Sequence, residues 1–389
     1  MKNVAGQPAR GENFFQRPDL TEQFKQKILS GSSIVISAPR RVGKTSLMYH
    51  LNDTGMEGYF FIYQITESVN TKNEYFKRLL HKIFDAEFLT SWQKFSKKAF
   101  QTIKDRAARI SEIGAGLKFD PDGKIDYYQE FIATIKSLDL NGQRIVLMID
   151  EFSQTIENII IDESEQSAVR FLQFNRELRQ DPEINQKIQF VYSGSIGLEN
   201  IVNRLNAIHL INDLDSLKVP PLSTEESHLL MQALTQEKEI TLDKSLRDYV
   251  LKKIEWYIPY YIQLAVQEIG NNVPTTTKTG ITKKNIDEAF ARMLELRNSF
   301  EHWHTRLRKA FKGEEYTFAK SLLSLVSENE TIQREEILNL AQKFNVGDHY
   351  KEILNALTYD GYLNNNIDPR VYRFNSPLLK MWWWKNVAY

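Results

Sequence analysis

Three residues near the start of the chain, Gly43, Lys44 and Thr45, have the types and the spacing that bind nucleotide phosphates. In such a loop the glycine lets backbone N–H groups approach the phosphates, the lysine reaches the β- and γ-phosphates, and the threonine hydroxyl ligates Mg²⁺. The usual first glycine is replaced by Ala38, one methyl group larger, which we expect to fit if its φ stays negative. The predicted phosphate-binding run is Ala38, Pro39, Arg40, Arg41, Val42, Gly43, Lys44, Thr45 and Ser46.

A pair of carboxylates, Asp150 and Glu151, directly follows an apolar run at 144–149. Ligands of an open α/β sheet bind at the carboxyl ends of its strands. We therefore expect Asp150 to hold Mg²⁺ through water, beside Thr45, and Glu151 to orient and polarise an attacking water molecule. Alone, an Asp-Glu pair at a strand end is equally typical of a helix N-cap. Its occurrence after a phosphate loop favours the metal site.

A weaker candidate is Ser193, in the segment Ser193-Gly194-Ser195 after another apolar run. A polar side chain in this position can sense the γ-phosphate. A polar strand-to-helix turn, with Ser195 as a helix cap, explains the segment equally well.

The elements that must position these residues are predicted from hydrophobic patterns. Apolar or β-branched runs predict strands at 34–37, 59–63, 144–149 and 187–192, and helical patterns separate them. A strand that is apolar throughout is typical of a parallel sheet buried on both faces. The expected fold class is therefore α/β, with a mainly parallel sheet.

Composition shifts suggest three domains. We expect a nucleotide-binding core at 1–218 with an insertion at about 71–140, a helical lid at 219–310, and a third domain at 311–389. Within the insertion, Asp-Pro-Asp-Gly predicts a β-hairpin turn rather than a calcium loop. The boundary is marked by Pro220-Pro221, followed by a capping box that opens a helix.

The third domain shows three helical patterns and then short strands, which is typical of a winged helix. Residues 312–389 carry nine Lys and Arg against ten Asp and Glu, so little charge is available to neutralise DNA phosphates. The only suitable basic pair is Arg370 and Arg373 on the predicted wing. DNA binding is therefore possible but not favoured, and a packing or regulatory role is preferred. Of the tryptophans at 382–384, we expect at least one in the core.

The whole chain has 50 basic and 50 acidic residues, so no global charge draws it to nucleic acid or lipid. It contains no cysteine, which excludes disulfides, thiolate metal sites and cysteine nucleophiles. His302 and His304 have no third ligand in view, so we expect structural roles for them. Without a signal peptide or a membrane-spanning apolar run, we expect a cytoplasmic protein with no membrane contact.

With these motifs placed, the chain resembles the AAA+/STAND group of P-loop ATPases, particularly the archaeal-type ATPase family with a C-terminal winged helix. The resemblance covers about residues 12–389. It depends on the segments "NFFQRPDLTEQFKQKI", "APRRVGKTSL", "VLMIDEF", "FVYSGSIG", "VPPLSTEES", "WYIPYYIQLA" and "FNSPLLKMWWW".

The resemblance implies an ATP-binding, Mg²⁺-dependent ATPase that acts as a nucleotide-driven switch, with ATP and ADP as ligands, an unknown protein partner and a possible homo-oligomer. The alternative is a DNA-binding loader or transposition-type ATPase related to the Cdc6/origin-recognition group. A nucleotide-binding scaffold without hydrolysis is a third reading. The sequence departs from the family pattern in two places. The glycine usual before the lid proline, Pro259, is absent, and the lid helix has no arginine where the family has one.

The resemblance also implies roles for residues outside the motifs. It places Phe14, Phe15 and Arg17 near the adenine, and the turn at Pro259 against the base. That proline is also explained as the first residue of a helix. The family's arginine finger is assigned best to Arg204, with Arg176 and Arg179 as alternatives. Within the loop, Arg40 and Arg41 are expected to meet phosphate, a partner or an acid of the winged helix.

Overall fold

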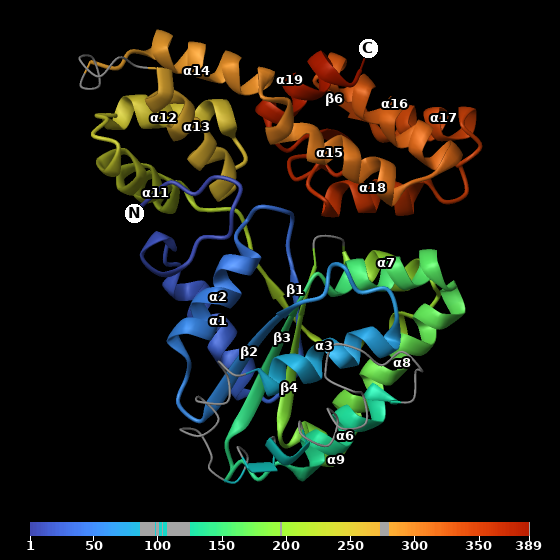
Figure 1. Ribbon diagram of the computed structural model, residues 1–389. Coiled ribbons are helices and arrows are strands. Elements are labelled where there is room, and N and C mark those ends of the chain that lie inside the picture. Colours follow the sequence, from blue (N-terminus) through green and yellow to red (C-terminus); the bar gives the residue numbers. More distant parts are fainter. Residues whose placement is uncertain are drawn as a thin grey trace. The chain divides into compact units, whose positions relative to one another are not determined.

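The computed structural model describes residues 1–85, 98, 101–102, 104–106, 125–194, 197–272 and 280–388 (Figure 1). The chain forms two compact units. One unit, the sheet unit, consists of 16–37 and 44–219, and the other, the helical unit, consists of 1–15, 38–43 and the chain from 220 onward. No helix among the described residues is long and apolar enough to cross a membrane.

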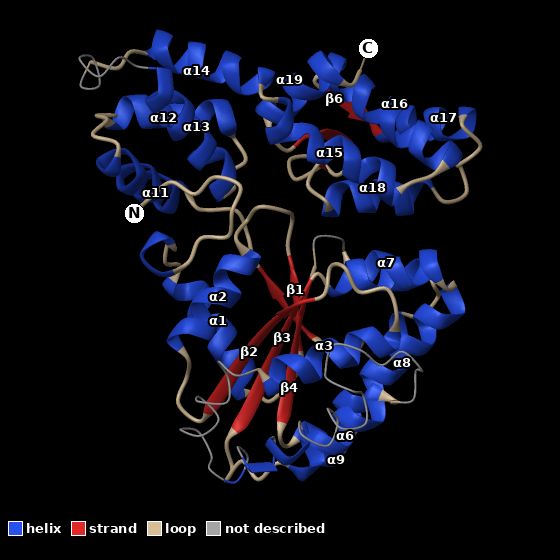
Figure 2. Cartoon of the chain, in the orientation of Figure 1, coloured by secondary structure: helices blue, strands red, loops and turns tan. Residues whose placement is uncertain are grey.

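The sheet unit contains a five-stranded parallel sheet in the order β2-β3-β4-β1-β5 (Figure 2). Its strands are β1 (Ile34–Ser37), β2 (Tyr59–Ile65), β3 (Arg144–Asp150), β4 (Ile188–Ser193) and β5 (Asp215–Lys218). The four predicted strands and the α/β fold class are thereby confirmed. The fifth strand, β5, was not predicted.

The burial of β3 agrees with its position between two other strands of the sheet. In β3 every residue after the first is buried, as an apolar strand covered on both faces requires. The helices of this unit are α1 (Pro18–Leu29), α2 (Lys44–Thr54), α3 (Lys72–Phe84), α6 (Tyr127–Ser137), α7 (Phe152–Asp162), α8 (Glu165–Gln180), α9 (Pro182–Asn185) and α10 (Leu198–Arg204). The Asp126 carboxylate caps α6 by accepting hydrogen bonds from the backbone N–H groups of Tyr128 and Gln129. The predicted hairpin turn just before it lies outside the described residues.

The largest segment of the helical unit begins after Val219. It opens with the predicted capping box, in which Ser223 and Glu226 exchange hydrogen bonds. Its first helices are α11 (Thr224–Glu237), α12 (Lys244–Ile254), α13 (Pro259–Asn272), α14 (Lys283–Glu295) and α15 (Arg297–Ala310). The N-terminal segment belongs to the same unit, where the Asn3 side chain donates to the Gln263 carbonyl at 2.7 Å.

The C-terminal part of the helical unit combines helices with a small antiparallel sheet in the order β6-β8-β7. The elements are α16 (Gly313–Asn329), β6 (Thr331–Gln333), α17 (Arg334–Lys343), α18 (Tyr350–Tyr359), β7 (Leu363–Asn364), β8 (Val371–Phe374) and α19 (Pro377–Asn386). The predicted order of three helices and a hairpin is present. The sequence did not predict β6, which lies between α16 and α17 in the chain. This strand pairs with β8.

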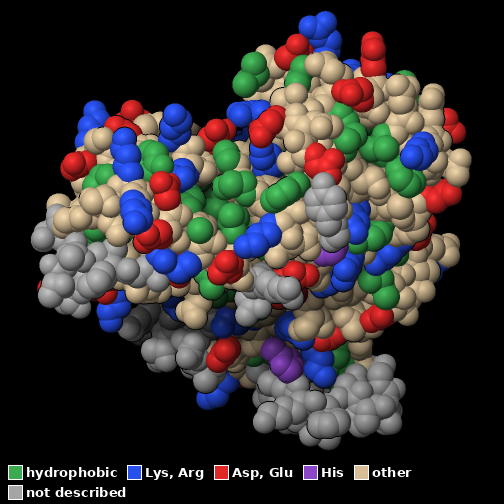
Figure 3. Space-filling view, turned by 90° about the horizontal axis from the view of Figure 1, so that it is seen from above, with side chains coloured by type: hydrophobic (Ala, Val, Ile, Leu, Met, Phe, Trp, Pro, Cys, Tyr) green, Lys and Arg blue, Asp and Glu red, His purple; other side chains and the backbone are tan. Residues whose placement is uncertain are grey.

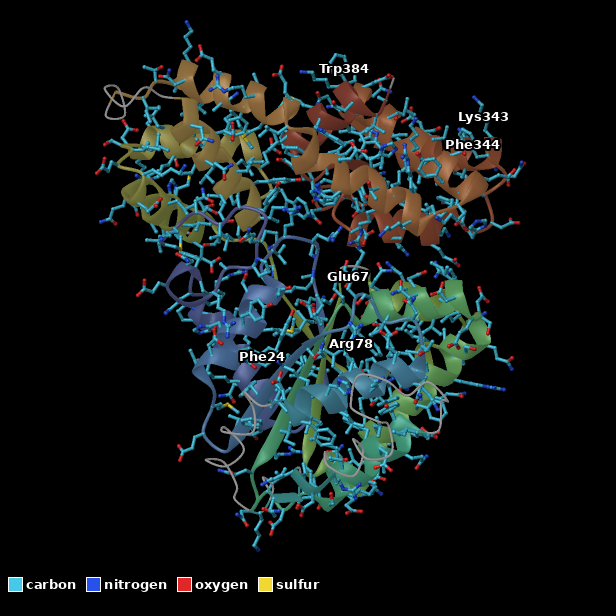
Figure 4. All side chains as sticks on the ribbon, in the orientation of Figure 1. Phe24, Glu67, Arg78, Lys343, Phe344 and Trp384 are labelled. Carbon is cyan, nitrogen blue, oxygen red and sulfur yellow. The ribbon has the colours of Figure 1, made fainter. Side chains whose placement is uncertain are left out.

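Large aromatic residues build the core of the helical unit. Trp303, Trp382 and Trp383 are fully buried, whereas Trp384, labelled in Figure 4, is half exposed. The expectation that at least one of the three C-terminal tryptophans enters the core is confirmed. Close packing also fixes Gly361, since a Cβ there would lie 2.3 Å from the Trp256 ring and its φ is +87°.

Candidate nucleotide and metal site

Asp150, the last residue of β3, is the centre of a hydrogen-bonded cluster in the sheet unit. Its side chain is buried, and its Oδ2 accepts hydrogen bonds from the Thr45 hydroxyl at 2.7 Å and the Tyr63 hydroxyl at 3.0 Å. The other oxygen, Oδ1, accepts from the backbone N–H of Glu151 at 3.0 Å. The two predicted magnesium ligands, Thr45 and Asp150, are therefore in direct contact although they come from separate motifs.

The backbone of Asp150 is held as firmly as its side chain. Its carbonyl accepts from the backbone N–H of Thr66 at 2.9 Å and from the Thr66 hydroxyl at 3.1 Å. In turn the Thr155 hydroxyl, on α7, lies 2.8 Å from the Thr66 carbonyl and 2.9 Å from the Thr66 hydroxyl. These contacts fix the end of β3 against the chain that leaves β2.

Electrostatics favour a cation beside Asp150. Burial raises the pKa of Asp150, and the neighbouring Glu151 carboxylate raises it further, whereas the hydrogen bonds from Thr45 and Tyr63 and the charge of Lys44 lower it. A divalent cation would relieve the cost of burying this carboxylate. Hydroxyl and carboxylate oxygens suit Mg²⁺, which usually keeps several waters and needs few protein ligands. No cluster of three or more His, Cys, Asp or Glu side chains suited to a metal occurs in the described residues.

Glu151 has an unusual backbone. Its φ of 59° and ψ of 30° lie in the left-handed region, which a non-glycine residue enters at an energetic cost. It stands at the N-cap of α7, yet its side chain makes no cap hydrogen bond. The side chain therefore does not cap the helix, and the role of Glu151 toward an attacking water stays a prediction.

The phosphate loop connects β1 to α2 and contains two residues with positive φ, Arg41 at 64° and Gly43 at 102°. Gly43 is where such a loop needs a glycine. Ala38 is buried and keeps a negative φ, as its substitution for glycine requires. Lys44, Thr45 and Ser46 form the first turn of α2, and Lys44 and Ser46 are buried, as is Val42 in the loop. Pro39 and Arg40 complete the predicted run.

The arginines of the loop have neighbours in the helical unit, to which residues 38–43 belong. The Arg41 guanidinium lies 3.9 Å from the centroid of the Tyr260 ring, a cation–π contact. Tyr260 directly follows Pro259, which begins α13 as the simple explanation of that proline predicted. The sequence did not predict this aromatic partner for a loop arginine.

Positive charge also gathers around His302 on α15. Burial and the guanidinium groups of Arg41, Arg40 and Arg306 lower the pKa of His302 to about 2, so this imidazole is neutral in the folded chain. In the unfolded chain its pKa returns to about 6.5. The unfolded state therefore binds an extra proton below that pH, and stability is lost as the pH falls.

We expect this histidine to account for about 2–3 kcal/mol of stability lost between pH 6.5 and pH 4.5. Replacing His302 with glutamine should flatten the dependence of unfolding free energy on pH in that window, as measured by urea denaturation. His349→Gln, at a partly exposed histidine, is the matched comparison, and the slope should flatten more in the His302 variant than in this one. An unaltered slope in the His302 variant would contradict the assignment.

Ser193 ends β4 and lies beside Ile36 of β1 in the sheet register. Its hydroxyl is buried and has no hydrogen-bond partner within the described structure. A buried hydroxyl without a partner at the carboxyl edge suits a polar ligand group. Ser195, its alternative explanation as a cap, lies outside the described residues.

The three arginines predicted as candidates for the arginine finger differ in their exposure and in their ion pairs. Arg204, at the end of α10, is 45% exposed and pairs with Glu157 at 2.5 Å. Arg179 is buried and forms two hydrogen bonds to the Asp213 carboxylate, at 2.7 and 2.9 Å. Burial and this pairing favour a structural role for Arg179, and its assignment as an alternative finger stays a prediction. Arg176 is partly buried and donates to the His209 carbonyl.

Phe15 and Arg17 precede α1. Phe15 is half-buried, and Arg17 is buried immediately before the proline that begins the helix.

Three residues of the hydrogen-bonded cluster at Asp150 were not predicted from the sequence: Tyr63, Thr66 and Thr155. A tyrosine inside an apolar strand, or a threonine in a loop or on a helix, carries no spacing signal that would have found them.

The parallel sheet, the loop after β1 and the Thr45–Asp150 contact after β3 together define an AAA+-like P-loop NTPase fold. Several solved structures match nearly the whole chain, among them the following two. The Walker-type ATPase of Pyrococcus abyssi has a TM-score of 0.64 at 14% identity, covering 97% of this chain and 98% of that one. The ORC2 protein of Aeropyrum pernix, in its ADPNP–ADP complexes, has a TM-score of 0.53 at 12% identity, covering 97% and 96%. No family model and no curated protein matches the sequence.

Proposed function

We propose that this protein binds ATP with Mg²⁺, hydrolyses it, and uses the nucleotide as a conformational switch. The observation that carries the proposal is the hydrogen bond between Thr45 and Asp150, formed at the carboxyl edge of a P-loop sheet. A hydroxyl and a carboxylate brought together from the phosphate loop and the end of β3 are the oxygen ligands that a nucleotide-bound Mg²⁺ requires.

Each residue of the site has a distinct task in this mechanism. Lys44 and the backbone N–H groups of residues 38–46 would bind the phosphates, and Thr45 and Asp150 would hold Mg²⁺, which would supply positive charge beside the phosphates. Glu151 accepts hydrogen bonds from the attacking water and polarises it. Ser193 senses the γ-phosphate with its unpartnered hydroxyl. Arg204 supplies the finger, since its ion pair is half exposed and exchangeable. Phe15, Arg17 and Pro259 bind the base.

We interpret the third predicted domain, 311–389, as a regulatory winged helix whose partner is protein rather than DNA. Of the two wing arginines, Arg370 pairs with Asp368 at 3.1 Å and Arg373 pairs with Glu255 at 3.0 Å. Both cations already have a carboxylate partner within the chain, so DNA phosphates would have to compete with these carboxylates for them. On the face in Figure 3, basic and acidic side chains are interspersed. A cytoplasmic location and a homo-oligomeric active form belong to the same proposal.

Lys44→Ala tests the nucleotide site directly. We expect ATP affinity to fall about 10- to 100-fold in equilibrium binding with a fluorescent ATP analogue, because a charge-assisted contact to phosphate is lost. Lys82→Ala, on α3 of the same unit, is the control and should bind like the wild type. Equal affinity for all three proteins would overturn the assignment. Tight ATP binding without phosphate release would instead indicate a nucleotide-binding scaffold.

A further inference from the structure

We propose that Tyr63 is a positioning residue of the magnesium site, which orients the Asp150 carboxylate for the metal. The juxtaposition that carries it is a strand tyrosine hydroxyl 3.0 Å from the same carboxylate oxygen that the phosphate-loop threonine contacts. This inference rests on the proposed function and adds a residue that no motif contains.

Backbone register explains why Tyr63 reaches the site. β2 and β3 run parallel, and Tyr63 lies beside Met148 in the register while Ile65 lies beside Asp150. The tyrosine is therefore set back from the edge by two residues, and its long side chain spans that distance. A shorter residue at position 63 would not place a hydroxyl at the carboxylate.

A second contact fixes the ring itself. Tyr63 packs against Tyr49 of α2, with ring centroids 4.6 Å apart and planes inclined by 54°. Tyr49 and Thr45 are four residues apart, so they lie on the same face of α2. One helix face thus supplies both the threonine that meets Asp150 and the aromatic surface that holds Tyr63 in place.

Tyr63 acts as the donor toward Asp150. Its hydroxyl lies 3.0 Å from the Asp150 Oδ2 atom. An ionised carboxylate accepts hydrogen bonds and donates none. The contact therefore runs from the phenol to Asp150.

The donors around Asp150 are divided between its two oxygens. The Glu151 backbone N–H occupies Oδ1, whereas Thr45 and Tyr63 share Oδ2. Thr45 is itself a ligand of the proposed metal site, so Tyr63 is the side-chain donor on Oδ2 that has no other task there. Removal of such supporting groups typically weakens metal affinity about 10- to 100-fold.

The test is Tyr63→Phe, which removes the hydroxyl and keeps the ring that packs on Tyr49. Tyr59→Phe is the matched control, because Tyr59 lies on the same strand and face but at the amino end, far from Asp150. We expect Tyr63→Phe to bind Mn²⁺ about tenfold more weakly in the presence of a non-hydrolysable ATP analogue, as measured by electron paramagnetic resonance. The Mg²⁺ concentration for half-maximal turnover should rise by the same factor, with turnover at saturating Mg²⁺ and metal-free ATP binding within twofold of wild type.

The double variant Tyr63→Phe/Asp150→Asn decides whether Tyr63 acts through Asp150. If it does, Tyr63→Phe should cause no further loss of Mn²⁺ affinity once Asp150 is asparagine. An equal additional loss in that background would overturn the inference, as would an unchanged Mn²⁺ affinity in the single variant. A wild-type protein that binds no ATP is a different result, because it removes the proposed function itself.

Discussion

Replacing Glu151 with glutamine is expected to lower ATP turnover about a thousandfold while ATP affinity stays within a few-fold of the wild type. The amide keeps the size of the side chain but cannot accept a proton or polarise water, and general-base contributions amount to about 10²–10⁴-fold. Glutamine also keeps the Cβ that the left-handed backbone at this position already accommodates, so the fold should be unaffected. Phosphate release in a single turnover, measured beside equilibrium ATP binding, separates the chemical step from binding.

Two comparisons sharpen this experiment. Glu165→Gln, at an exposed glutamate in the first turn of α8, makes the same chemical change away from the site and should turn over like the wild type. Turnover of Glu151→Gln at the wild-type rate would show that Glu151 is not the base. Loss of ATP binding in that variant would show instead that the carboxylate supports the nucleotide pocket.

Most of the sheet was predictable because its strands are apolar on both faces. β3 is buried from Ile145 to Asp150, and such a run has few alternatives to a central parallel strand. β5 escaped prediction for the opposite reason. Its four residues, Asp215–Lys218, are mostly polar and only Leu217 is buried, so the strand is defined by its pairing with β1 rather than by its own pattern.

The contact between Thr45 and Asp150 was also predictable, because parallel strands bring their carboxyl ends to one edge and both motifs follow such ends. The contacts of Tyr63 depend on the register of β2 against β3, which alternating polarity does not reveal. The partner of Arg179 was equally hidden, since Asp213 lies in an irregular segment before β5. Contacts between side chains that are distant in the sequence depend on strand register and on the paths of loops. Local sequence patterns predict neither.

A second large effect is expected in the helical unit, where Arg306→Met should lower the free energy of unfolding by about 3–5 kcal/mol. The Arg306 guanidinium donates to the Asp360 carboxylate at 2.8 and 2.5 Å, and the two side chains are only 5% and 6% exposed. This pair joins α15 to the end of α18. Methionine would leave the buried carboxylate without its partner, and an uncompensated buried charge costs far more than the pair contributes.

The size of this effect depends on burial, which a matched pair can test. Arg370→Met breaks an arginine–aspartate pair at an exposed site, where Arg370 is 78% exposed, and should cost less than about 1 kcal/mol. The double variant Arg306→Met/Asp360→Leu removes both buried charges and should recover most of the loss. Urea unfolding followed by tryptophan fluorescence reports on this unit, because five of the six tryptophans lie at 256, 303, 382, 383 and 384. If Arg306→Met and Arg370→Met proved equally mild, the buried pair could not be what holds α15 to α18, and the aromatic core around Trp303 would have to do so alone.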